Sequence, residues 1–317
     1  MPDPDSLPEI RDRERPPVAL IAGPTASGKS AVAMRLARAT GGIIINADAS
    51  QVYADLNVLT ARPPEEDLAQ APHRLFGHID GMEDCSAARW AQEAKAEIDA
   101  AHAKGVPAIL VGGTGLYLHT LLHGIAPVPA IDPAIRDAVR ALPVAQSYAA
   151  LELEDPVSAG RLNPADTSRV ARALEVVRST GTPLPQWQAR REGGLAGHMR
   201  IHGAVVMLPR EVLAERAEQR LDLMLAHGAI EEVEALVRRD IPPDRPVLRA
   251  LGVRELAAML AGEIDRATAR AAILQQTIAY QKRQRTWARG RQAGWTTIDP
   301  QAEVTIEDFS SIAPEGH

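Results

Sequence analysis

Short apolar runs alternate with amphipathic segments in the first part of the chain. The runs at 18–22 (VALIA), 42–48 (GIIINAD) and 106–113 (VPAILVGG) are rich in branched aliphatic residues, as buried strands are. The segment 86–104 has helical periodicity, and Ser86 is suited to cap its first turn. Buried strands separated by helices predict a parallel sheet of the α/β class.

The pattern changes between residues 127 and 200. Three segments there, DPAIRDAVRAL, DPVSAGRL and DTSRVARALEVVRSTG, each open on an aspartate suited to an N-cap and carry apolar residues at helical spacing. We interpret 127–200 as a helical insertion domain. An apolar run at 203–208 (GAVVML) returns to the sheet, and the rest is mainly helical. The expected core is therefore 17–126 and 201–317, preceded by a disordered tail over 1–16.

Composition narrows the possible classes of protein. The 317 residues are 45% hydrophobic with a formal net charge of −6, so any binding of nucleic acid must depend on local basic patches. A single cysteine, Cys85, excludes an intramolecular disulfide. The sequence has no apolar run of about 18 residues, which is the length that a membrane span needs. The N-terminus is unlike a signal peptide. We expect a cytoplasmic monomer with no membrane partner.

The loop after the first expected strand has the pattern of a phosphate-binding site. It fits G-x-x-x-x-G-K-[ST] between a strand and a helix, and its residues are Gly23, Pro24, Thr25, Ala26, Ser27, Gly28, Lys29 and Ser30. Its backbone N–H groups and the following helix N-terminus would face an anion, Lys29 would add charge, and Ser30 would offer a hydroxyl to Mg²⁺. The fold class expected is a P-loop NTPase-like α/β core with a parallel sheet, a helical insertion domain and C-terminal helices.

Two further segments leave strands at the edge where open α/β sheets bind ligands. Asp48 ends the second expected strand, and Thr114 stands in the glycine-rich turn GGTGLYL after the third. On position alone, Asp48 could equally be a turn or cap aspartate, and the glycines an ordinary strand-to-helix turn.

Several arginines and lysines recur at helical spacing. Arg216 and Arg220 are four residues apart on one expected helix face, where Glu215 and Glu218 could pair with them. The stretch KRQRTWARGR has five basic residues and no acidic one, and Lys282, Arg285 and Arg289 share a face. With the pairs Arg169 and Arg172, and Arg249 and Arg254, such residues could grip RNA phosphates, although each alone is more often a solvated surface residue.

These motifs together resemble a known family. GPTASGKS, DASQVY…LTARP, APHRLF, VGGTGLYL, NPADTSRVARALEVV, LAERAEQRLDLML, RALGVREL and QKRQRTWARG occur in the order seen in bacterial tRNA dimethylallyltransferases, from about residue 18 to 295. The phosphate loop by itself is shared by many NTPases, but the ordered set is specific.

The resemblance implies an activity and roles for residues. The family transfers a dimethylallyl group from dimethylallyl diphosphate to N6 of the adenosine at tRNA position 37, next to the anticodon. By resemblance, the phosphate loop holds the diphosphate with Mg²⁺ at Ser30, Arg220 adds positive charge, Asp48 is the general base, and Thr114 lines the channel where base and donor meet. The insertion would embrace the tRNA anticodon stem-loop.

The resemblance also implies a set of tRNA contacts: Asp48, Ala49, Ser50, Gln51, Ser168, Arg169, Val170, Ala171, Arg172, Arg249, Arg254, Lys282, Arg283, Gln284, Arg285, Trp287 and Arg289. Two positions depart from the family pattern. Ala49 stands where a serine is usual, with Ser50 one place later, and Leu59 stands where a glycine is common.

Three alternatives remain open at this point. A P-loop kinase of small molecules would place ATP in the loop and use Asp48 toward a hydroxyl. A prenyltransferase acting on free adenine nucleotides would not need the basic patches. An RNA-binding NTP switch would carry out no transfer.

Overall fold

A computed structural model describes residues 17–196, 198–301 and 310–311. The tail expected over 1–16 lies outside the described residues. The chain divides into two compact units, a helical unit over Leu122–Gly194 and a sheet unit made of the residues before and after it. The sequence predicted an insertion over 127–200. The helical unit of the structure begins and ends several residues earlier.

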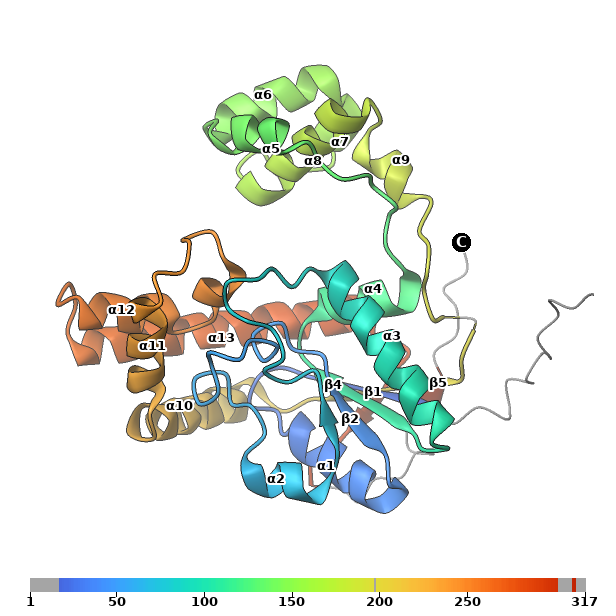
Figure 1. Cartoon of the computed structure of the whole chain (residues 1–317), viewed down its shortest axis with the longest axis vertical. Coiled ribbons are helices and arrows are strands. Elements are labelled where there is room, and N and C mark those ends of the chain that lie inside the picture. The colour runs from blue at the N-terminus through green and yellow to red at the C-terminus, as the bar shows by residue number, and fades with distance from the viewer. Residues whose placement is uncertain (1–16, 197, 302–309, 312–317) are drawn as a thin grey trace, which may run out of the picture. The chain divides into compact units, whose positions relative to one another are not determined.

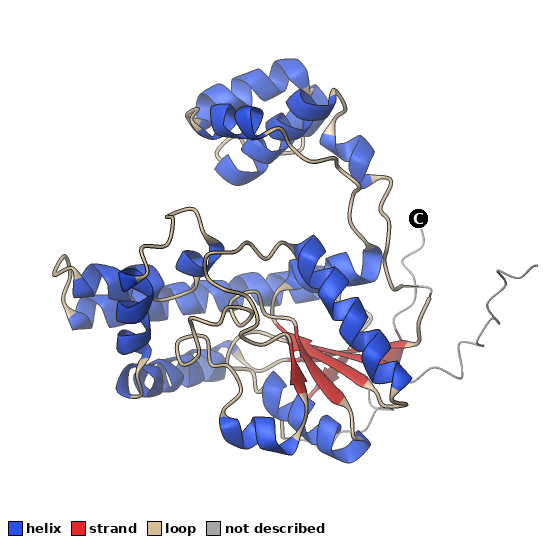
Figure 2. Ribbon diagram, viewed as in Figure 1, coloured by secondary structure: helices blue, strands red, loops and turns tan. Residues whose placement is uncertain are grey.

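The sheet unit is built on a largely parallel sheet (Figures 1 and 2). Its described strands follow the order β3-β2-β4-β1-β5-β6, and β7 pairs antiparallel with β5. Their bounds are β1 Val18–Ala22, β2 Ile43–Asn46, β3 His73–Arg74, β4 Ala108–Gly112, β5 Ile201–Val206, β6 Thr296–Ile298 and β7 Ser310–Ser311. The strand expected at 203–208 starts two residues earlier, and the two-residue β3 was not predicted.

Helices cover both faces of this sheet (Figure 1). Val32 and Leu36 of α1 pack in one cluster with Ile21 of β1 and Ile109 of β4. The helix α3 begins after Ser86, whose side chain accepts from the N–H of Arg89 as expected. The helices of this unit are α1 Lys29–Thr40, α2 Glu65–Gln70, α3 Ala87–Ala103, α4 Gly115–His123 (whose last turn enters the helical unit), α10 Arg210–Ala226, α11 Ala229–Arg238, α12 Val253–Leu260 and α13 Arg266–Arg291, with a 3₁₀ turn at Pro246–Arg249.

The helical unit has its own core. The helix α8 is buried through Val170, Ala173 and Leu174, which cluster with Val139 and Leu151. Its helices are α5 Pro133–Arg140, α6 Val144–Glu154, α7 Pro156–Ala159, α8 Thr167–Thr180 and α9 Leu184–Gln188. The expected caps are confirmed, since Asp132, Asp155 and Asp166 each accept a backbone N–H of the first helical turn.

Candidate active site

The phosphate loop joins β1 to α1 through two residues with a left-handed backbone, Ala26 and Gly28. Gly28 has a φ of 91°, in the left-handed region. A Cβ at Gly28 would lie 2.9 Å from Cβ of Pro300, and one at Gly23 would lie 2.6 Å from the carbonyl oxygen of Val206. Gly28 is therefore favoured by its backbone conformation and by space, and Gly23 by space alone. A loop of this shape can turn backbone N–H groups toward an anion.

Two cations lie at this loop. Lys29 is half-buried, and its Nζ donates to the carbonyl oxygen of Pro24 over 3.4 Å. Removal from water lowers the pKa of Lys29 to about 8, against the attraction of Asp48. Arg220 of α10 donates to Oγ1 of Thr25 over 2.8 Å, and burial lowers its pKa. Because these cations are partly removed from water, an interaction with a negatively charged ligand would be strong.

Asp48 follows β2 at the carboxyl edge of the sheet. The buried amide of Asn46 accepts from the N–H of Asp48 over 2.8 Å and donates to its carbonyl oxygen over 3.0 Å. Ser50 donates to Oδ1 of Asp48 through its hydroxyl over 2.7 Å, and Thr114 accepts from the N–H of Ala49 over 2.9 Å. The hydroxyl beside Asp48 thus comes from Ser50 in this chain, one place after Ala49, the position that departs from the family pattern.

Lys29, Arg220, Asp48 and Thr114 all line one cavity of about 390 Å³ in the sheet unit. That volume is in the range of small-molecule sites. Its apolar part includes Leu59, Leu221, Met224 and Ile273. The residues expected from the sequence that line it are Thr25, Lys29, Ser30, Asp48, Ala49, Ser50, Gln51, Thr114, Arg220, Arg249 and Arg283.

The segment 49–62 forms one wall of this cavity and is fixed by two side chains. Gln51 donates to the carbonyl oxygens of Thr60 and Ala61, each over 2.8 Å. Glu232 of α11 accepts the N–H groups of Asn57, Val58 and Leu59. The amide of Gln51, expected at the tRNA, therefore also holds the wall in shape.

The helix α13 contributes three residues that the sequence did not place at the phosphate loop. Gln281 donates to the carbonyl oxygen of Thr25 over 3.1 Å, and Gln284 accepts the Thr25 N–H over 2.8 Å while donating to Gly113. Tyr280 lines the cavity, and burial followed by the charge of Asp48 raises its pKa to about 12. These three residues share one face of α13, a spacing visible in the sequence, but nothing there shows that this face meets the phosphate loop.

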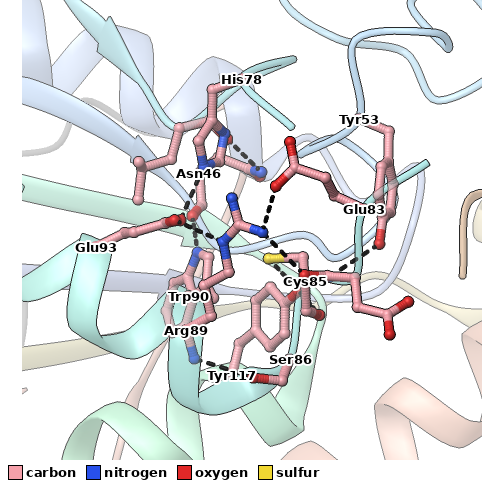
Figure 3. A network of polar contacts seen from close by, with 12 residues as sticks. Asn46, Tyr53, His78, Glu83, Cys85, Ser86, Arg89, Trp90, Glu93 and Tyr117 are labelled. Atoms are coloured by element: carbon pink, nitrogen blue, oxygen red, sulfur yellow. Dashed lines mark hydrogen bonds and ion pairs between the residues drawn. The ribbon is translucent and has the colours of Figure 1, made fainter. Parts of the chain in front are cut away.

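A polar network supports the Asp48 side of the cavity (Figure 3). The indole of Trp90 donates to the carbonyl oxygen of Asn46 over 2.8 Å and stacks on Tyr117 with ring centroids 4.5 Å apart. The Tyr117 hydroxyl donates to the carbonyl oxygen of Cys85. Burial raises the pKa of the Cys85 thiol, so the thiol stays protonated at neutral pH.

The residues expected at tRNA have different exposures. Arg249, Arg254, Lys282, Arg283 and Arg289 are exposed in the sheet unit, whereas Arg285 and Trp287 are half-buried. In the helical unit Ser168 and Arg169 are exposed, Arg172 and Ala171 are half-buried, and Val170 is a core residue. All of the expected tRNA contacts stay predictions, and Gln284 and Val170 are buried in their units.

The described ranges contain no helix with the length and apolar character needed to span a bilayer. Nor do the described residues bring three or more His, Cys, Asp or Glu side chains together in a cluster that could hold a metal ion.

A parallel α/β sheet whose first strand leads through this loop into a helix defines the chain as a P-loop protein. Within that class the chain belongs to the IPP transferase family, whose model matches residues 51–291. It is a transferase, as the motifs predicted.

Comparison with individual proteins agrees with the family. The tRNA dimethylallyltransferase of Sphingopyxis alaskensis is 59% identical over 297 residues, covering 93% of this chain and 97% of that protein. The one from Zymomonas mobilis subsp. mobilis is 52% identical over 296 residues, covering 93% and 95%. Among solved structures, the full-length tRNA isopentenylpyrophosphate transferase from Bacillus halodurans has a TM-score of 0.65 at 30% identity and covers 90% of each chain. A eukaryotic dimethylallyltransferase acting on tRNA has a TM-score of 0.75 at 27% identity, covering 86% of this chain and 70% of that one.

Proposed function

We propose that this chain transfers the dimethylallyl group of dimethylallyl diphosphate to N6 of the adenosine at position 37 of tRNA. The observation that carries the proposal is that Asp48 and the cations Lys29 and Arg220 line one cavity. The relatives described above are named as enzymes that act on tRNA. The exposed cations of α13 offer a surface for the phosphates of tRNA.

The reaction needs opposite charges at its two ends. The exocyclic amine of adenine is a poor nucleophile because its lone pair is shared with the ring. Asp48 would accept the N6 proton as the bond from N6 to the allylic carbon forms. The bond from that carbon to the diphosphate oxygen breaks, and Lys29 and Arg220 would stabilise the negative charge that develops there. The adenine base at position 37 must leave the base stack of the tRNA to reach Asp48.

Magnesium fits the same residues. The Ser30 hydroxyl and the Asp48 carboxylate line the cavity together with Lys29. Mg²⁺ prefers oxygen donors and is commonly held by one or two protein groups together with phosphate oxygens and water. Ser30 would hold the ion, which when bound would neutralise charge on the diphosphate. The cytoplasmic location and the monomeric state expected from the sequence also stay predictions.

A transfer assay tests the proposal. The protein is incubated with labelled dimethylallyl diphosphate and either unmodified tRNA or AMP, and separately with ATP and tRNA. We expect label in tRNA alone. Label in AMP would favour the enzyme of free nucleotides, and phosphate transfer from ATP would favour the kinase.

The Asp48→Asn variant tests the base. It removes a proton acceptor while keeping the shape, so we expect the single-turnover rate with saturating substrates to fall by about 10² to 10⁴-fold. Asp84→Asn is the matched control, because Asp84 is exposed and pairs with Arg245 at the surface. A rate for Asp48→Asn near that of the wild type would remove Asp48 from this role.

A further inference from the structure

A second cavity of about 400 Å³ lies against the phosphate loop in the sheet unit. Lys29, Ser30 and Arg220 line both cavities, so these residues stand between the two spaces. The second cavity is also lined by Gly28 of the loop and by Arg216 of α10. The phosphate loop can therefore be approached from a side other than that of Asp48 and Thr114.

Arg216 points at the loop from this second side. A Cβ built at Gly28 would lie 3.7 Å from Nη1 of Arg216, which puts the guanidinium beside the left-handed turn of the loop. Arg220, one turn further along α10, reaches Thr25. The two arginines therefore face the loop at different points along it.

The two carboxylates nearest to Arg216 along α10 have other partners, and Asp67, which also lines the second cavity, forms no ion pair with Arg216 in the described part of the chain. Glu215 accepts from Gln219 over 3.2 Å, and Glu218 pairs with Arg270 over 2.9 Å. Within the described ranges, no hydrogen bond or ion pair is formed by the Arg216 guanidinium. A half-buried arginine that has no ion pair and lies next to a phosphate loop is suited to bind an anion.

We propose that Arg216 is a further ligand of the diphosphate, which it binds from the second cavity and retains as the leaving group once transfer is complete. The identity of the donor rests on the proposed function. The diphosphate carries several negative charges, and Lys29 and Arg220 supply two positive groups. Arg216 supplies a third, and its planar fork can donate two hydrogen bonds to one phosphate.

Binding of inorganic pyrophosphate, with Mg²⁺ and without tRNA, tests this assignment in the full chain. A hydrogen-bonded charge contributes about 1.5–3 kcal/mol, so calorimetry with Arg216→Ala should give a Kd about 10-fold to 100-fold higher than that of the wild type. Arg216→Lys keeps the charge without the fork and should fall between the two. Arg216→Gln retains much of the side-chain length and should behave like Arg216→Ala.

The matched control is Arg210→Ala, because Arg210 is exposed at the start of the same helix. It should leave the Kd for pyrophosphate unchanged, and no Arg216 variant should change the Kd for tRNA. A Kd for pyrophosphate within twofold of the wild type in both Arg216→Ala and Arg216→Gln would overturn the assignment. Because this readout involves no transfer, a protein that binds pyrophosphate through Arg216 but does not modify tRNA would contradict the proposed function alone.

Discussion

The pKa of Lys29 is set by the residues around it. The charge of Asp48 favours the protonated form of the Lys29 ammonium, and the charge of Arg220 opposes it. Burial outweighs the attraction of Asp48, and the resulting pKa of about 8 lies far below the ordinary value of 10.5. A bound diphosphate would reverse the balance, because its negative charge favours the protonated lysine.

We therefore expect the affinity for pyrophosphate to fall as the pH rises through about 8. The sign follows because the free protein loses the Lys29 proton over this range, whereas the complex requires it. Calorimetry at pH values on either side of that midpoint measures the effect. Lys29→Arg is the control, since its guanidinium stays charged, and its affinity should change less with pH. An equal pH dependence in both proteins would assign the effect to another group.

The helix α13 has two faces with separate tasks. Tyr280, Gln281 and Gln284 face the cavity and the phosphate loop, whereas Lys282 and Arg289 are exposed. Arg285 is half-buried, and its Nε has no hydrogen-bond partner among the described residues. The inward face would order the loop while the outward face would meet RNA phosphates.

The triple variant Lys282→Ala/Arg285→Ala/Arg289→Ala tests the two exposed cations of the outward face together with the half-buried Arg285. Each lost phosphate contact should lower the slope of log affinity against log salt by roughly 0.7 to 0.9. tRNA affinity across a salt series measures this slope, and saturating tRNA should restore much of the transfer rate. Arg270→Ala on the same helix is the control, because Arg270 pairs with Glu218 and Asp222. An unchanged slope in the triple variant would mean that these residues are a solvated face.

At the scale of the whole molecule, the chain separates two kinds of binding residue between its units. The residues around the phosphate loop all belong to the sheet unit, whereas Arg169 and Arg172 belong to the helical unit. Leu195 donates to the carbonyl oxygen of Leu121 over 2.9 Å, so the chain leaves and re-enters the sheet unit at one place. Changes in the helical unit can therefore be made without altering the residues that line the two cavities.

We expect Arg169→Ala/Arg172→Ala to raise the Kd for tRNA on the order of tenfold, because two phosphate contacts are lost. The Kd for pyrophosphate should stay at the wild-type value. Arg178→Ala on the same helix is the matched control. Arg178 forms a close ion pair with Glu154 over 2.7 Å, whereas Arg169 and Arg172 lie 3.6 and 3.7 Å from their carboxylates and are freer to turn to a phosphate. A similar loss of tRNA affinity in Arg178→Ala, or a parallel loss of pyrophosphate affinity, would contradict a specific tRNA contact in this unit.

The sequence by itself determined the features that depend on neighbouring residues. The main strands followed from apolar runs, and the helix starts followed from Ser86, Asp132, Asp155 and Asp166, because a cap bonds within its own first turn. The phosphate loop was predictable for the same reason. Its glycines, lysine and serine act within eight consecutive residues. The family followed from the order of motifs, which needs no coordinates.

Only the tertiary structure decided which side chains meet across the fold. The two-residue β3 has no apolar run of its own and pairs with β2 because of the surrounding packing. Gln284 is 259 residues from its partner Thr25 along the chain. Helical spacing shows that Arg216 and Arg220 share a face, but not which way that face turns. The orientation of a helix is set by burial of its apolar side against distant elements, and local sequence does not encode that choice.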